Sequence, residues 1–115
     1  MNETRYVQTI IACCLERDFE IMKAGDLTEI GEKGINLSGG QKARVTLARA
    51  VYANKDIILM DDPISALDSK VKKKIWKRVF QTMLKGKTRI LATNAIDFMH
   101  LADHIIVLKE GNVAI

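Results

Sequence analysis

Leu37-Ser38-Gly39-Gly40-Gln41 stands at the start of a helix that we expect to begin near Ser38 and to continue through residues 42–52. Ser38 is a residue type that caps helices, and the two glycines after it leave backbone N–H groups free to surround an anion. The helix dipole adds to that attraction. Because such caps also occur for purely structural reasons, the residues on either side decide what this one does.

A buried strand and an amphipathic helix are expected downstream. Residues 56–60 form a nearly continuous apolar run that ends in Asp61-Asp62-Pro63, which is typical of a strand buried on both faces. The helix after it has apolar residues at helical spacing and ends in a basic residue and a glycine; these residues are Val71, Ile75, Val79, Phe80, Met83, Lys85 and Gly86.

The rest of the chain alternates between helices and strands. We expect a helix over residues 3–15, capped by Asn2 or Thr4, and a glycine-rich loop over residues 23–34. The apolar face of that helix comprises Val7, Ile10, Ile11, Cys14 and Leu15. Strands over 88–93 and 104–108 flank a short helix over 96–101, and a hairpin turn at 110–112 leads into 113–115. This order predicts an α/β fold with a mainly parallel sheet, flanking helices and an antiparallel edge.

Composition indicates a globular chain with one modest core. The chain has 115 residues, of which 48% are hydrophobic, and a net charge of +4 that is concentrated in residues 70–78. We interpret that basic stretch as a solvated helix face rather than a contact with a polyanion or a lipid headgroup. Cys13 and Cys14 are adjacent, and His100 and His104 have no partners at ligand spacing, so no metal site is expected beyond a nucleotide's Mg²⁺. No run approaches the ~20 apolar residues of a transmembrane helix, and the polar start is not a signal peptide.

These motifs together resemble the ATP-binding cassette (ABC) ATPases, whose signature motif matches Leu37 to Gln41. The resemblance covers essentially the whole chain. It is most specific toward the first nucleotide-binding domain of the multidrug-resistance-associated exporters, through residues 25–36 and 61–68. It implies the C-terminal part of a P-loop NTPase fold, with the helical signature region over residues 1–50. Residues 51–115 would then hold the Walker B strand, the D-loop and the switch loop.

The resemblance also implies roles for individual residues. Asp61 would end the Walker B strand and hold Mg²⁺ through water, which suits a hard carboxylate. Ser65-Ala66-Leu67-Asp68 matches the D-loop, which lies across the dimer interface in the family, and Asp68 is also a plausible helix N-cap. Ser38, Gly39, Gly40 and Gln41, together with Leu37, would cap ATP that is held by the partner domain.

Two positions depart from the family pattern. Asp62 occupies the place of the catalytic glutamate and is one methylene shorter, so its carboxylate is poorly placed for the attacking water. Asn94 occupies the place of the switch histidine and cannot carry a charge or a proton near neutral pH. The chain's own site is therefore expected to be degenerate and to hydrolyse ATP slowly.

The phosphate-cradling Walker A sequence, Gly-x-x-x-x-Gly-Lys-Ser/Thr, does not occur in the chain. Whether the chain is an enzyme by itself is therefore left open, and the isolated chain is expected to bind ATP poorly and to be marginally stable or to self-associate. The expected partners are a second nucleotide-binding domain in a head-to-tail dimer and the transmembrane domains of a transporter. Residues 28–34 resemble the exporter loop that touches the coupling helices of the membrane domain.

The sequence thus predicts part of an exporter's ATP-binding cassette, on the cytosolic face of a membrane, with ATP and Mg²⁺ as cofactors and no nucleic acid partner. One alternative is a soluble ABC protein of chromosome maintenance or translation, in which the basic helix would contact nucleic acid. Residues 64–68 and the exporter-like loop argue against it. A second alternative is an inactive, truncated interaction module.

Overall fold

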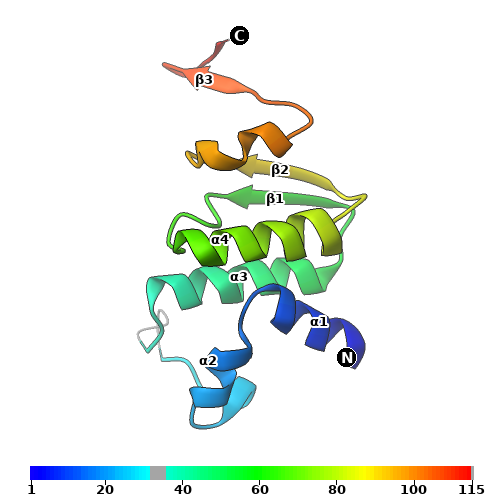
Figure 1. Ribbon diagram of the computed structural model, residues 1–115, viewed down its shortest axis with the longest axis vertical. Helices are drawn as coiled ribbons and strands as arrows, with labels where there is room; N and C mark the ends of the chain where they lie inside the picture. Colours follow the sequence, from blue (N-terminus) through cyan, green and yellow to red (C-terminus); the bar gives the residue numbers. More distant parts are fainter. Residues whose placement is uncertain (32–35, 115) are drawn as a thin grey trace.

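The elements of this chain are strung along one axis. The structure is a computed structural model that describes residues 1–31 and 36–114. It measures 49 × 29 × 24 Å, and its radius of gyration is 15.2 Å, against about 13 Å for a compact domain of this size. Figure 1 shows a C-terminal hairpin at one end, then two strands, then stacked helices, with the N-terminal helices at the other end.

The N-terminal part is helical. Helix α1 (Glu3–Ala12) begins at Asn2, whose side chain accepts a hydrogen bond from Arg5 N, so one of the two expected caps is observed. The expectation that this helix reaches residue 15 is wrong. Cys14 adopts a left-handed conformation, with φ of 56°, and a second helix, α2 (Glu16–Ile21), follows. A short 3-10 helix, η1 (Gly25–Leu27), lies within the expected loop.

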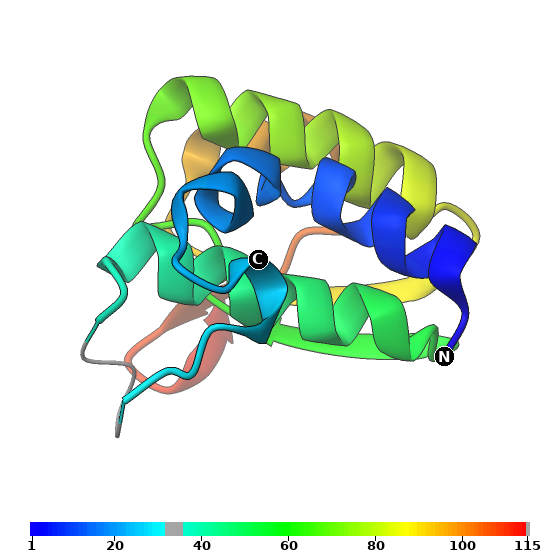
Figure 2. The same ribbon diagram turned by 90° about the horizontal axis from the view of Figure 1, so that it is seen from below.

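The buried face of α1 also differs from the expected one. Val7 and Ile11 are largely exposed, whereas Thr9, Ala12, Cys13 and Leu15 are buried. The turn at Cys14 explains the difference in part, because it brings Cys13 and Leu15 into the core instead of continuing the helical stripe. Figure 2 shows α1 lying between the long helix α3 (Gly39–Ala53) and the helix that follows the first strand.

The parallel part of the predicted sheet is confirmed as two strands. Strand β1 (Ile57–Asp61) pairs in parallel with β2 (Thr88–Ala92), with Ile57 opposite Thr88 and Asp61 opposite Ala92. The connection is helix α4 (Ser69–Ile75), which continues without a break as a wider π-helix, η3 (Trp76–Met83). This β-α-β order is the arrangement that parallel pairing requires.

Only one face of this strand pair is covered by the described residues. Ile58 and Met60 are buried against the helices, but Ile57 is 64% exposed and Leu59 is 73% exposed. The prediction of a strand buried on both faces is therefore wrong for this chain. The helices account for the difference, since the shared core joins Ile58 and Met60 to residues of α3, α4 and η3 and leaves the opposite face open.

The C-terminal segment forms a separate hairpin. After the 3-10 helix η4 (Ile96–Leu101), strand β3 (Val107–Lys109) pairs antiparallel with β4 (Asn112–Ala114). Glu110 and Gly111 both have positive φ, as a tight hairpin turn of the expected kind requires. The expected strand over 104–108 begins only at Val107. Within the described residues it pairs with β4 alone, so the antiparallel edge does not join the β1–β2 pair.

The core lies between the helices and the covered face of the strands. Its most deeply buried side chains are Leu15, Ile64, Ile75, Val79 and Leu84. Trp76 stacks between Phe80, at 4.6 Å between ring centroids, and Phe98, at 4.7 Å. Trp76 therefore serves packing, and its contact with Phe98 attaches η4 to the main body.

Candidate functional site

The turn at the start of α3 presents free backbone donors. Ser38 has extended backbone angles, its Oγ accepts a hydrogen bond from Gln41 N at 3.1 Å, and Gln41 Oε1 accepts one from Ser38 N at 2.8 Å. This reciprocal capping box satisfies the third N–H group of the helix. In the described part of the chain the N–H groups of Gly39 and Gly40 donate to nothing. Together with the Ser38 hydroxyl proton, they can bind an anion.

A buried carboxylate, which sequence reasoning did not single out, holds this turn from behind. Asp18 of α2 is 9% exposed, and its Oδ1 accepts from Gln41 Nε2 at 2.9 Å. Its carboxylate also forms an ion pair with Arg44, whose Nη1 donates further to the Cys14 carbonyl oxygen at 2.5 Å. The sequence signal was weak, because Arg44 is one of three charged residues, with Lys42 and Arg49, in a mainly apolar helix.

The charge state of Asp18 follows from these contacts. Burial raises the pKa of its carboxyl group, but hydrogen bonds from Arg44 and Gln41 and the positive charge of Arg44 outweigh burial and hold the pKa below its usual value. Asp18 is therefore an anion at neutral pH. It accepts charge-assisted hydrogen bonds, which are stronger than neutral ones.

The signature turn lies directly against the segment that follows β1. A Cβ atom added to Gly40 would lie 3.4 Å from the Ala66 carbonyl oxygen and 3.7 Å from Leu67 Cδ2. Ile64 and Leu67 are buried, which fixes this segment against the core. Asp68 caps α4 by accepting from Val71 N at 2.9 Å. The structure therefore brings Gly39 and Gly40 of the signature against Ala66 and Leu67 of the segment that matches the D-loop.

The expected acidic residues gather at the carboxyl ends of the two parallel strands. Asp61 ends β1 opposite Ala92, and Asp62 N donates to the Ala92 carbonyl oxygen at 2.7 Å. Asn94 follows two residues after Ala92, at the same edge. Asp61, Asp62 and Asn94 are all exposed there. Asp62 has φ of 47°, a strained conformation that Asp tolerates better than most residues.

The exporter-like loop is described only in part. Glu32, Lys33, Gly34 and Ile35 lie outside the described residues. On either side of them, Asn36 joins the two arms of the loop, since its Oδ1 accepts from Gly31 N and its Nδ2 donates to the Glu29 carbonyl oxygen, both at 3.2 Å. The start of the loop is fastened to α1, because the Tyr6 hydroxyl donates to Asp26. That hydrogen bond, with burial and the Asp26 charge, raises the pKa of Tyr6 to about 12.

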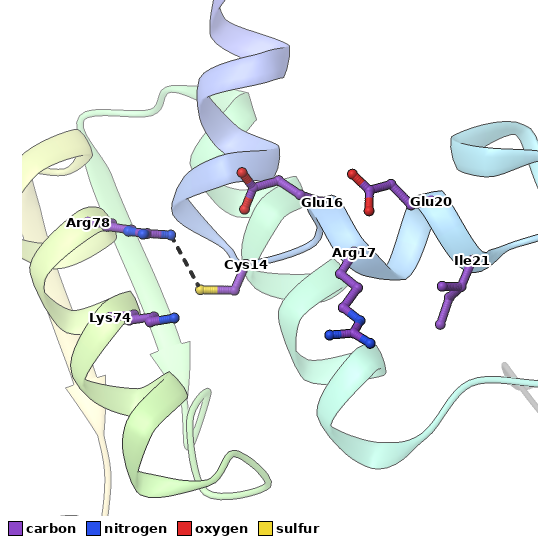
Figure 3. A pocket seen from close by; sticks show the side chains of 7 residues that line it. All are labelled: Cys14, Glu16, Arg17, Glu20, Ile21, Lys74 and Arg78. Atoms are coloured by element: carbon purple, nitrogen blue, oxygen red, sulfur yellow. Dashed lines mark hydrogen bonds between the residues drawn. The ribbon is translucent and has the colours of Figure 1, made fainter.

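Two surface hollows lie elsewhere. One, of about 680 Å³, opens between α2 and α4, as Figure 3 shows; its lining residues are Cys14, Glu16, Arg17, Glu20, Ile21, Lys74 and Arg78. In it Arg78 Nη1 donates to Cys14 Sγ at 3.8 Å. The other, of about 840 Å³, lies between α1 and η3. Neither is lined by residues 37–41, Asp61, Asp62 or Asn94. Ser38, Gly39, Asp61, Asp62 and Asn94 are exposed and so lie on the open surface of the described residues.

Comparisons with known proteins show which family this chain resembles. A family model described as ABC transporter matches residues 14–65. ATP-binding cassette sub-family C member 3 of Homo sapiens is 55% identical over 116 residues, which cover 99% of this chain and 8% of that protein. Multidrug resistance protein mrp-7 of Caenorhabditis elegans is 54% identical, covering 97% of this chain and 8% of that protein.

A similar relative comes from a distant organism. ABC transporter C family member 8 of Dictyostelium discoideum is 52% identical, covering 98% of this chain and 7% of that protein. The chain thus spans 7–8% of the length of these curated relatives. In residues 1–31 and 36–114, no helix combines the length and the apolar character that crossing a membrane demands.

Proposed function

Because this chain belongs to the ABC transporter family, as part of a nucleotide-binding domain of the subfamily C type, we propose that it supplies one half of a shared ATP site in an exporter. The family's domain implies that ATP is the ligand. The observation that carries the proposal is the Ser38–Gly40 turn, which lies beside the D-loop segment and in which the Gly39 and Gly40 N–H groups find no acceptor among the described residues. An open surface of this kind suits a nucleotide held between two domains.

Residues 38–40 fit a phosphate, and residues at the strand ends fit a hydrated Mg²⁺. The capping box holds Ser38 at the N-cap of α3, so its hydroxyl and the N–H groups of Gly39 and Gly40 all belong to the first turn, where a helix can bind a phosphate. Asp61 offers an exposed hard carboxylate, as Mg²⁺ prefers. We assign the signature, Leu37 to Gln41, to the site that binds ATP held by a partner domain, whether by direct contact or by support, and Asp61, Asp62 and Asn94 to the domain's own site. Asp68 lies at the interface between the two.

In the chain, residues 1–50 then correspond to the helical signature region and residues 51–115 to the Walker B, D-loop and switch-loop part of the P-loop core. The exposed face of β1, with Ile57 and Leu59, supports the assignment of residues 51–115 to part of a P-loop core, because a full core would cover that face. On this proposal the domain lies at the cytosolic face of a membrane and pairs with a second nucleotide-binding domain and with transmembrane domains. Residues 25–36 and 61–68 resemble the first nucleotide-binding domain of the multidrug-resistance-associated exporters, so we assign this chain to the first of an exporter's two nucleotide-binding domains.

The alternatives are less well supported. A soluble ABC protein of chromosome maintenance or translation is not favoured, since the similar proteins are named as transporters or multidrug resistance proteins. The proposal leaves the transported substrate unspecified.

A chimera tests the proposal. Residues 1–115 replace the matching segment of a subfamily C exporter, and ATPase activity is measured in membranes. We expect Gly39→Asp to abolish most of the activity that depends on this signature, because a carboxylate would stand where the phosphate binds. The nearest atom to a Cβ on Gly39 is 4.0 Å away, so the fold has room for the change.

Gln81→Glu, which adds the same charge at an exposed position on η3, serves as the matched control and should leave the activity unchanged. Equal activity of the Gly39→Asp chimera and the unsubstituted chimera would overturn the proposal.

The degenerate character of the own site has its own test. In the chimera, Asp62→Glu together with Asn94→His should raise turnover, toward the ~100-fold that a well-placed proton acceptor contributes. Each single substitution should give less than the pair, because both groups act on the same water. Unchanged turnover in the double variant would contradict the assignment of Asp62 and Asn94 to that site.

A further inference from the structure

We infer that Gln41 does not contact the nucleotide, and that Gln41 and Asp18 are instead positioning residues that lock the phosphate-binding turn onto α2. The inference deepens the proposed function and rests on it. The signature motif is thereby divided into a contacting part, residues 38–40, and a supporting part, Gln41.

The side-chain amide of Gln41 is engaged at both ends. Its Oε1 accepts from Ser38 N at 2.8 Å, and its Nε2 donates to Asp18 Oδ1 at 2.9 Å. The orientation is unambiguous, because the reverse one would set the oxygen against a carboxylate and the nitrogen against an N–H group. An amide held in this way points back into the protein, away from the open surface that Gly39 and Gly40 line.

Asp18 is fixed just as firmly. Both of its oxygens accept from Arg44, which lies one turn further along α3 than Gln41, and Nη2 of Arg44 reaches Oδ1 at 3.3 Å. Arg44 also holds the Cys14 carbonyl oxygen in the turn between α1 and α2. One carboxylate thus joins α2 to the first two turns of α3. Helix α2 ends at Ile21, and the chain then passes through η1 to Glu29, where Asn36 closes the loop.

These contacts couple the position of α2 to the orientation of the phosphate-binding N–H groups. The directions of the Gly39 and Gly40 N–H groups depend on the first turn of α3, which Gln41 and Ser38 close. A displacement of α2 pulls on Gln41 through Asp18 and so turns the donors relative to the phosphate. Because phosphoryl transfer depends mainly on positioning, a small misalignment lowers turnover strongly.

A donor–acceptor exchange tests the inference in the chimera. Gln41→Glu keeps the capping box, since a glutamate oxygen still accepts from Ser38 N. It also sets two carboxylates face to face, so we expect turnover to fall by roughly tenfold or more, the effect of losing a hydrogen bond to a charged group. Adding Asp18→Asn supplies an amide donor from the opposite side and restores the net charge, so turnover should recover to within about threefold of the unsubstituted chimera.

If Gln41 contacts the nucleotide directly, the double variant stays as defective as Gln41→Glu alone, because a glutamate still faces the phosphates; this result would overturn the inference. Failure of the proposed function is seen separately, as normal activity in the Gly39→Asp chimera. Turnover that is unaffected by Gln41→Glu would also overturn the inference.

The 115-residue chain provides a readout that does not depend on activity. In ¹⁵N NMR spectra, Asp18→Ala should shift the Gln41 side-chain amide and the Gly39 and Gly40 backbone amides. Glu20→Ala, at an exposed position on the same short helix, should leave them in place. Protection of the Val79 amide from exchange, deep in the core, reports whether each variant is folded. If the Gln41, Gly39 and Gly40 resonances do not shift in a folded Asp18→Ala chain, Asp18 does not position the turn.

Discussion

Two regions of this chain differ in how well their side chains are paired or covered. One is the signature end, which comprises residues 38–41 with Asp18 and Arg44, and the other is the strand end, which comprises β1 and β2. At the signature end Asp18, Gln41 and Arg44 are hydrogen-bonded to one another or to Ser38, and no buried side-chain nitrogen or oxygen in the described residues lacks a partner. At the strand end the apolar side chains of Ile57, Leu59 and Ile90 face solvent. The surface proposed for a partner's nucleotide is thus preorganised, whereas the chain's own site sits beside an uncovered sheet.

The sharpest test of this contrast uses neighbouring residues on β1. In the isolated chain Ile58→Ala should lower the free energy of unfolding by about 3 kcal/mol, because Ile58 is 5% exposed and its truncation leaves a cavity. Leu59→Ala, one residue on and 73% exposed, should change it by less than about 0.5 kcal/mol. Denaturant unfolding measures both.

The same two substitutions in the chimera test whether other parts of the protein cover the open face of β1. If other parts of the P-loop core lie over its open face, Leu59→Ala should become as costly as Ile58→Ala in the chimera, by thermal inactivation of ATPase activity. If Leu59→Ala has little effect on stability in the chimera as well as in the isolated chain, the open face of β1 is not covered by other parts of the core, and this interpretation of the strand end is wrong.

A second test addresses the signature end. Arg44→Met removes one partner of the ion pair and leaves Asp18 buried with only Gln41, so we expect a loss of about 2 kcal/mol in the isolated chain. This lies below the ~3–5 kcal/mol typical of fully buried pairs, because the two side chains are 14% and 12% exposed. Lys87→Met, which breaks an ion pair with the fully solvated Asp56, is the control and should cost under about 0.5 kcal/mol. Equal costs would mean that the Asp18 network contributes no more than a surface pair.

Local signals predicted the parts of this structure that local chemistry determines. The Ser38 cap, the Asp68 cap, strand β2 and the Glu110–Gly111 turn follow from residue types that favour one backbone conformation each. The end of α1 could not be predicted, because the left-handed turn at Cys14 depends on burial of Leu15 and on the hydrogen bond from Arg44, thirty residues away.

In the candidate site, too, the sequence indicated some residues and missed another. The resemblance to the family pointed to Ser38 to Gln41, Asp61, Asp62 and Asn94, but not to Asp18, since one acidic residue in a short charged helix has no distinctive pattern. The sequence overestimated the burial of β1. An apolar run shows that both faces of a strand are suited to burial, but the described residues cover one face only.

The smallest expected effect concerns pH and again separates the two ends. Contacts to Arg44 and Gln41 hold the pKa of Asp18 below its unfolded value, which is about 3.9. A carboxyl group with a lowered pKa stabilises the fold above its unfolded pKa, and this contribution disappears as the pH falls through its folded pKa. The unfolding free energies of the chain and of Asp18→Asn should therefore differ by a constant amount between pH 5 and 8, and the difference should shrink below about pH 4. Denaturant titrations at each pH measure it. A difference that stays constant down to pH 3 would mean that hydrogen bonding, and not the charge of Asp18, holds α2 to the signature turn.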